Sequence, residues 1–194
     1  MKVVIIQYNA GNTQSVSFAL QRLGIDPVIS DDPDIIRTAD KVIFPGVGEA
    51  STAMHYLRER NLDKVIPGLQ QPVLGICLGM QLLCDFSEEN DTTCLGLVPI
   101  QVKKFSSPLE KVPQVGWNTI YNLQEPLFTG IPEQSYIYNV HSYYAEHSPY
   151  TIATGNYVHE YAAAIRNKNF FGVQFHTEKS AVIGERILSN FLQL

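Results

Sequence analysis

Short apolar runs alternate with helical patterns along the first 86 residues of the chain. Strands are predicted at Lys2–Tyr8, Pro27–Ser30, Lys41–Phe44 and Val73–Ile76, and helices at Thr13–Leu23, Ala50–Arg60 and Leu78–Phe86. Asn12 occupies the N-cap position of the first helix, and Gly24 follows its end. Strands connected through helices lie parallel in a sheet that helices cover on both faces. The alternation therefore predicts an α/β fold with a mostly parallel central sheet.

The segment Leu95–Tyr161 follows a different pattern. Its short strand-like runs are separated by Pro99, Pro108, Pro113, Pro126 and Pro132, and few helical periods occur between them. This pattern predicts an irregular, partly antiparallel extension of the sheet. Ala162–Arg166 and Phe171–Phe175 are again predicted as strands, and Ala181–Leu192 as a closing helix. With no repeat or linker, residues 1–194 are expected to form a single domain.

Composition excludes several classes of protein. The formal net charge is -5 with only 14 Lys and Arg residues, which argues against nucleic acid as the main partner. No apolar run approaches the roughly 20 residues that a membrane helix needs. The first eight residues lack the cleavage site of a signal peptide, so a soluble cytoplasmic protein is expected. Three cysteines without a C-x-x-C pair favour neither disulfides nor zinc, and we expect no metal or cofactor.

The most informative segment is the corner at Cys77. The strand predicted to end at Ile76 is followed at once by a helix from Leu78, which leaves no loop between them. A residue on such a corner is lifted above the edge of the sheet, and Gly75 and Gly79 flank it where a Cβ would crowd the turn. The layout matches the G-x-S-x-G nucleophile elbow with Cys in place of Ser. We therefore predict a thiolate nucleophile, favoured by the start of the helix, rather than a buried core cysteine.

A thiolate nucleophile needs a base and a group that orients the base. His176 lies at the predicted end of a strand, two residues before Glu178. Residues i and i+2 of an extended chain share a face, so the carboxylate is expected to hold the imidazole. His55, His147 and His159 lack such a partner and are expected on solvated surfaces, whereas the role of His141 stays open.

The motifs together resemble those of the class I (triad) glutamine amidotransferases. The matching segments are Pro45-Gly-Val-Gly48, Gly75-Ile-Cys-Leu-Gly-Met-Gln81 and Gly172-Val-Gln-Phe-His-Thr-Glu-Lys-Ser180, and the resemblance covers essentially the whole chain. It implies the fold of that family and a Cys77–His176–Glu178 triad that releases ammonia from glutamine. Thr177 stands where the family usually has Pro, and Gln114 stands near a position where histidine is common.

The resemblance also implies how the substrate is held. The oxyanion would be bound by the amide of Leu78 and by one from Val47 or Gly48, so the Gly46–Gly48 strand is expected to act as a switch. Main-chain groups of Gly48, Ser142 and Tyr143 would bind the amino-acid head of glutamine. Gln81 would either hold the α-carboxyl end of the substrate or stabilise the site. The alternatives are an exposed helix residue for Gln81 and a packing turn for Ser142–Tyr144.

Within the family, the chain is similar to the stand-alone glutaminase subunits of histidine biosynthesis. The details that carry this similarity are Pro45-Gly-Val-Gly48, Gly116-Trp-Asn118, Val140-His-Ser-Tyr-Tyr144 and the lack of an attached synthetase domain. Such subunits pass ammonia to a (β/α)8-barrel cyclase subunit in a heterodimer. The resemblance would put Asn12, Trp117, Tyr138 and Lys179 near that interface.

Three alternatives remain open at this point. Tyr8–Thr13 resembles a flavodoxin phosphate loop, which would make the protein a flavin-binding electron carrier. A cysteine peptidase is possible, although Glu178 follows the histidine instead of preceding it as in the α/β-hydrolases. A sister amidotransferase subunit for anthranilate, aminodeoxychorismate or guanylate synthesis would share the triad and differ only in the acceptor.

Overall fold

A computed structural model describes all 194 residues and contains one 13-stranded sheet. The strands are β1 (Val3–Ile6), β2 (Val28–Ser30), β3 (Lys41–Gly46), β4 (Val73–Cys77), β5 (Cys84–Ser87), β6 (Thr92–Thr93), β7 (Val98–Lys104), β8 (Gln114–Tyr121), β9 (Ser135–His141), β10 (Tyr143–Ala145), β11 (Thr151–Asn156), β12 (Glu160–Asn167) and β13 (Phe170–Val173). The helices are α1 (Thr13–Arg22), α2 (Pro33–Arg37), α3 (Ala50–Glu59), α4 (Leu62–Val65), α5 (Leu78–Leu83) and α6 (Ala181–Leu192), with 3₁₀ turns at Ile66–Gly68 and Thr177–Lys179.

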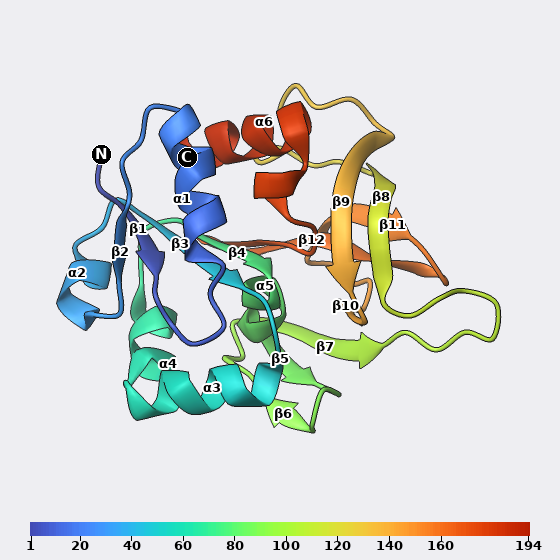
Figure 1. Cartoon of the computed structure of the whole chain (residues 1–194), viewed down its shortest axis with the longest axis horizontal. Coiled ribbons are helices and arrows are strands. Elements are labelled where there is room, and N and C mark those ends of the chain that lie inside the picture. Colours follow the sequence, from blue (N-terminus) through green and yellow to red (C-terminus); the bar gives the residue numbers. More distant parts are fainter.

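The parallel part of the sheet has the order β2-β1-β3-β4-β13. Figure 1 shows α1 and α6 on one face of it and α3 and α4 on the other. Alternate residues of β1 divide accordingly: Val4 packs into the core beneath α3, and Ile5 packs into the core beneath α1 and α6. Strands covered on both faces are apolar throughout, which explains the continuous Val and Ile runs. The predicted fold class is confirmed.

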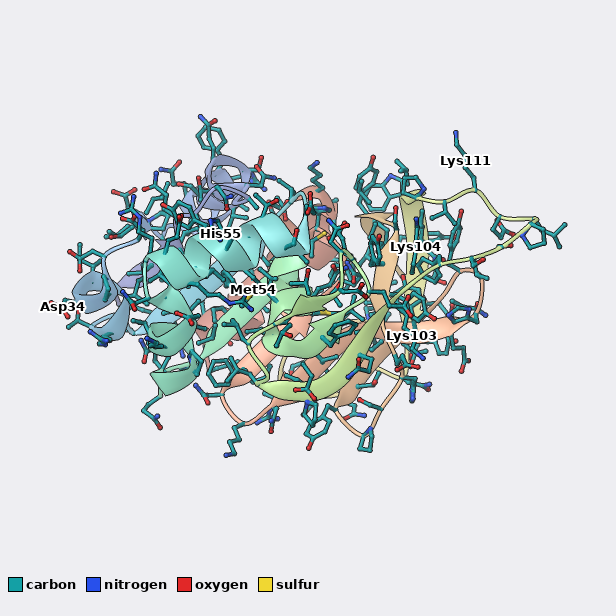
Figure 2. The ribbon with its side chains drawn as sticks, turned by 90° about the horizontal axis from the view of Figure 1, so that it is seen from below. Asp34, Met54, His55, Lys103, Lys104 and Lys111 are labelled. Atoms are coloured by element: carbon teal, nitrogen blue, oxygen red, sulfur yellow. The ribbon has the colours of Figure 1, made fainter.

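The extension is antiparallel for the most part. Beyond β13 the sheet continues through β12, β10 and β7, each antiparallel to its neighbour, and β8 and β9 form a long ribbon that joins through β11. The loop between β7 and β8, which carries Lys111, projects from the molecule (Figure 2). None of the helices combines the length and apolarity that a membrane-spanning segment requires.

Some predicted boundaries were wrong. Pro45 and Gly46 continue β3 instead of ending it, and they pair with Ile76 and Cys77 of β4. The helix expected to reach Phe86 ends at Leu83, because Cys84–Ser87 pairs with β7. The short helix α2 was missed, although Asp32 caps it by accepting from two backbone N–H groups. Strand pairing outweighs local helix propensity at Cys84–Ser87.

Candidate active site

Cys77 lies on a sharp corner where β4 meets α5, as the sequence predicts. Its backbone has φ 54° and ψ -111°, a region that non-glycine residues seldom adopt. A Cβ on Gly79 would lie 1.8 Å from the carbonyl oxygen of Phe44, and one on Gly75 would lie 2.8 Å from the backbone of Gly79. Both glycines are therefore required for α5 to pack closely on β3 and β4. The close packing holds the cysteine in its strained conformation.

The neighbouring strand supplies the histidine. β13 lies parallel to β4, with Val173 opposite Ile76, and the chain then turns to place His176 beside the cysteine. His176 Nδ1 lies 2.8 Å from Glu178 Oε1, and only 3% and 1% of the two side chains are exposed. The pair forms as predicted, but the reason given for it was wrong. Residues Thr177–Lys179 form a 3₁₀ turn, so the turn brings the carboxylate back to the ring.

The charge of His176 follows from its surroundings. Burial lowers the pKa of the imidazole, but hydrogen bonds to Cys77 and Glu178 and the charges of both groups outweigh burial and raise it to about 10. Because Nδ1 is engaged by Glu178, the ring presents Nε2 to the sulfur. At neutral pH the imidazole of His176 is therefore protonated. Asn12 Nδ2 donates a second hydrogen bond to Glu178 Oε1, at 3.3 Å.

A cavity of about 320 Å³ opens over the cysteine and the histidine. Its lining includes most of the predicted substrate-binding residues, and the full set is Val47, Gly48, Cys77, Leu78, Gln81, Glu89, Pro113, Val140, His141, Ser142, Tyr143, His176 and Lys179. Gly46 was predicted as a binding residue but does not line the cavity. A Cβ there would lie 2.2 Å from Tyr8 Oη, so its glycine is required for packing.

The strand opposite the nucleophile holds one amide away from the cavity. The N–H of Val47 donates to the carbonyl of Ala10 at 2.6 Å. That carbonyl belongs to the loop Tyr8–Thr13, which was considered as a phosphate loop. The next residue, Gly48, has φ +105°, and only the Ala10 side chain lies within 4 Å of its missing Cβ. Gly48 thus adopts a conformation that L side chains rarely adopt, and the space beside it is open.

Gln81 is buried, which makes the alternative of an exposed helix residue wrong. Its Nε2 donates to the carbonyl of Tyr143 at 3.0 Å and to Gln174 Oε1 at 2.9 Å. Both N–H bonds of the amide are thus used within the protein. Of the two roles considered for Gln81, this geometry favours stabilising the site.

The four residues expected near a partner surround the same region. Lys179 lines the cavity, and the Trp117 ring, 54% exposed, meets the Tyr138 ring edge-on at 5.7 Å. The carbonyl of Tyr138 accepts from the N–H of His176 at 2.9 Å, which connects the β8–β9 ribbon to the histidine. Asn12 precedes α1 as predicted, but its side chain does not cap the helix, because it reaches Glu178 instead.

Two polar residues that line the cavity were not among the predicted site residues. Glu89 lines the cavity and accepts from the N–H of Ala50 at 2.7 Å; no motif in the sequence marks it. His141 also lines the cavity, and its Nδ1 bonds the carbonyl of Tyr143 at 2.8 Å. Burial lowers the pKa of His141, and the nearby charge of His176 lowers it further. Together they outweigh the hydrogen bond to Tyr143, which raises the pKa, so that its value is about 4. His141 is therefore neutral, and its place beside Ser142 was the available signal.

The remaining predicted residues lie elsewhere. His55 pairs with Glu59 on the outer face of α3, whereas the neighbouring Met54 is buried (Figure 2). His159 is exposed as predicted, with one edge of its ring against Tyr144. Gln114 is buried and accepts a 3.4 Å hydrogen bond from Tyr161. All three cysteines are free, and no group of three or more His, Cys, Asp or Glu side chains is arranged to hold a metal.

Comparison with known proteins agrees with this geometry. Residues 4–194 match the family model described as glutamine amidotransferase class-I. The imidazole glycerol phosphate synthase subunit HisH of Bacteroides fragilis YCH46 is 52% identical over 196 residues, and that of Bacteroides thetaiotaomicron is 50% identical, each over the full length of both chains. HisH of Blochmanniella floridana is 46% identical, again over both full chains.

Solved structures share the fold at low sequence identity. A protein whose structure is described as that of a glutamine amidotransferase superimposes with a TM-score of 0.75 at 16% identity, covering 98% of this chain and 97% of that one. A glutamine amidotransferase from Thermotoga maritima superimposes with a TM-score of 0.64 at 17% identity, covering 100% and 83%. The match along residues 4–194 makes the flavodoxin-like alternative wrong. The chain belongs to the class I glutamine amidotransferase family and, within it, to the HisH subunits of imidazole glycerol phosphate synthase.

Proposed function

We propose that this chain hydrolyses glutamine to glutamate and ammonia and passes the ammonia to a (β/α)8-barrel cyclase subunit, for the synthesis of imidazole glycerol phosphate and aminoimidazole carboxamide ribotide. One observation carries the proposal. Cys77 lies on a strained elbow and lines the same cavity as His176, and His176 is held by the buried Glu178. We assign the catalytic roles to Cys77 as nucleophile, His176 as base and Glu178 as the group that orients the base.

The charge state of the site supports a thiolate as the attacking group. His176 takes the proton of Cys77 as the sulfur attacks, and the raised pKa of the imidazole favours this transfer. The sulfur attacks the side-chain carbonyl carbon of glutamine and forms a C–S bond. When the C–N bond breaks, His176 gives its proton to the leaving nitrogen and ammonia departs. Water, deprotonated by His176, then attacks the thioester and releases glutamate.

The oxyanion formed in each step needs hydrogen-bond donors. The amide of Leu78 is one candidate, next to the attacking sulfur. The amide of Val47 is the other, but here it donates to Ala10. A site with one donor turned away is poorly active, so this contact supports the proposal that the Gly46–Gly48 strand acts as a switch. Binding of the partner and its substrate would turn the peptide and complete the site.

The cavity offers complementary groups to the amino-acid head of glutamine. The carboxylate of Glu89 lines it and suits the α-ammonium group. Main-chain groups of Gly48, Ser142 and Tyr143 are proposed to bind the rest of the head. Gln81 is proposed to fix the position of Tyr143 through its carbonyl rather than to touch the substrate.

An apolar face beside the cavity supports a protein partner. Val115, Trp117, Tyr136 and Val140 are exposed on the β8–β9 ribbon, and Lys179 lies at the cavity itself. Ammonia is a nucleophile only when unprotonated. A partner that seals the cavity would keep the ammonia from escaping to solvent, where it would be protonated. We propose that Asn12, Trp117, Tyr138 and Lys179 contact the cyclase subunit. We also propose that residues 1–194 form one domain, since β1 and β13 belong to one sheet, and that the protein acts in the cytoplasm.

A glutaminase assay tests the proposal directly. Glutamate release is measured for the isolated chain, for the chain with the cyclase subunit, and for the complex with the nucleotide substrate of the cyclase. Strong stimulation in the last mixture is expected. Stimulation by chorismate-using enzymes instead would overturn the choice of partner, and release of labelled peptides would favour a peptidase.

A further inference from the structure

The motif residue Gln174 has no role in the reaction as described so far, yet it touches the nucleophile. It follows β13, and none of its surface is exposed. Its Nε2 lies 3.8 Å from Cys77 Sγ, and its Oε1 accepts from Gln81 Nε2 at 2.9 Å. A buried amide is retained where its polar groups are all needed, so each of these contacts calls for an explanation.

The orientation of the Gln174 amide follows from a backbone carbonyl. The carbonyl of Tyr143 can only accept, so the group of Gln81 that faces it is the NH₂. The same NH₂ faces Gln174, which must therefore present its oxygen to Gln81. The NH₂ of Gln174 is left on the side of the sulfur. These contacts together fix which end of each amide is the NH₂. They direct an N–H donor of Gln174 toward Cys77.

A donor at this place matters for the charge on the sulfur. Cys77 Sγ also lies 3.8 Å from the carbonyl of Val140, to which only a thiol can donate. The negative charge of a thiolate would be repelled by the partial negative charge of that oxygen. A hydrogen bond from an amide N–H, by contrast, stabilises the ionised sulfur more than the neutral thiol. The Gln174 donor opposes the effect of the Val140 carbonyl.

We propose that Gln174 is a catalytic residue that stabilises the Cys77 thiolate by an N–H···S hydrogen bond. Gln81, which also donates to the carbonyl of Tyr143, holds Gln174 in this orientation. The Ser142–Tyr143 segment, which we propose to bind substrate, is thereby connected to Cys77 through the side chains of Gln81 and Gln174. The inference rests on the proposed function only in taking Cys77 as the nucleophile.

The test follows the reactivity of Cys77 toward iodoacetamide as a function of pH. Cys84 and Cys94 are buried away from the cavity, and the Cys77→Ala chain gives the background. In Gln174→Met the donor is lost, and in Gln174→Glu an anion replaces it while Gln81 keeps an acceptor. We expect alkylation at pH 7 to slow about tenfold in Gln174→Met and further in Gln174→Glu, with the pH midpoint moved upward by about one unit.

A matched control uses Gln101, an exposed glutamine on β7 that makes no side-chain hydrogen bond. Gln101→Met and Gln101→Glu should retain the wild-type profile. In glutaminase assays of the complex, kcat of the Gln174 variants should fall with a smaller change in KM. If Gln174→Met does not fold, the comparison between Gln174→Glu and Gln174→Asn, whose amide is too short to reach the sulfur, decides the question.

The outcomes separate the two proposals. A pH profile of the folded Gln174 variants that coincides with that of the wild type overturns the role of Gln174, even if kcat falls, because the residue would then act only through packing. A wild-type Cys77 that iodoacetamide does not modify, in a chain that releases no glutamate with its partner, overturns the proposed function itself.

Discussion

The N–H of Val47 donates to the carbonyl of Ala10 at 2.6 Å, which turns it away from the cavity above Cys77. The contact joins the end of β3 to the loop that precedes α1. The two segments follow different strands of the parallel sheet, β3 and β1. The active state that we propose requires this bond to break, so the bond opposes activity in the isolated chain.

Removing the amide of Val47 tests its role as an oxyanion donor. Val47→Pro has no N–H at this position. We expect its activity in the complex to fall about 100-fold or more, the usual effect of losing one oxyanion donor, while the low activity of the isolated chain changes little. Val47→Ala keeps the N–H and should retain partner stimulation. Equal stimulation of both variants would show that this amide takes no part.

Replacing the nucleophile separates hydrolysis from synthesis. In the complex, Cys77→Ala should lower glutamate release by about 10³-fold or more while synthesis from added ammonium salts continues. The reason is that the cyclase needs ammonia and not the sulfur. Cys94→Ala, at a buried thiol outside the cavity, is the control and should keep both activities. A Cys77→Ala complex that uses neither nitrogen source would contradict this division of labour.

Glu178 should control both rate and the alkaline limit of stability. The pKa of His176 is raised from 6.5 to about 10, so its contribution to the free energy of unfolding is complete below pH 6.5 and is lost as pH rises through about 10. Glu178→Gln removes one charge that raises this pKa, so the loss of stability should still begin near pH 6.5 but be smaller and end at lower pH. Its amide also cannot serve as the anionic partner of the ring, and kcat should fall about 10²- to 10⁴-fold.

Urea unfolding between pH 6 and 10 measures the stability effect, and glutamate release measures the rate. Glu185→Gln is the control, because Glu185 pairs with Arg22 at the surface. Identical pH dependence of stability in wild type and Glu178→Gln would contradict the ion pair.

His141 should act on stability at the opposite end of the pH scale. Its folded-state pKa of about 4 lies below the ordinary 6.5 because burial disfavours the charged ring. Its contribution is therefore complete above pH 6.5 and is lost as pH falls through about 4. In His141→Phe, urea unfolding should show a shallower loss of stability across this range. The surface variant His147→Phe should keep the wild-type slope, and a matching slope in His141→Phe would refute the assignment.

The close contact of α5 with β3 should make Gly79 irreplaceable. A Cβ at this position meets the Phe44 carbonyl oxygen at 1.8 Å, and a backbone atom cannot move aside as a side chain can. We expect Gly79→Ala to lower the free energy of unfolding by about 3 kcal/mol or more. Gly68→Ala, where no atom lies within 4 Å, is the matched control and should change little. Similar urea midpoints for the two variants would show that the corner is loosely packed.

The parallel half of the fold and the Cys77 elbow could be predicted from the sequence because those features are locally encoded. Apolar runs mark buried strands, and the absence of a loop at Cys77 allows only a corner. The register that places β13 beside β4 is not local, since it depends on pairing between segments about a hundred residues apart. The resemblance to a family, rather than periodicity, supplied that proximity.

The errors have physical causes of the same kind. Glu178 reaches His176 from a 3₁₀ turn, which residue spacing cannot distinguish from an extended strand. Asn12 could cap α1 or bond elsewhere, and the buried carboxylate of Glu178 decides between them. Glu89 lies in a short polar run that looks like an exposed turn, and only the three-dimensional fold brings it into the cavity.

The position of β13 has a consequence for synthesis of the protein on the ribosome. β13 fills the space between β4 and β12, and the imidazole and carboxylate of the triad come directly after it. A growing polypeptide that already contains the Cys77 elbow still lacks His176 and Glu178. We therefore expect incomplete chains on the ribosome to release no ammonia, because the last strand to emerge directly precedes the two residues that complete the proposed triad.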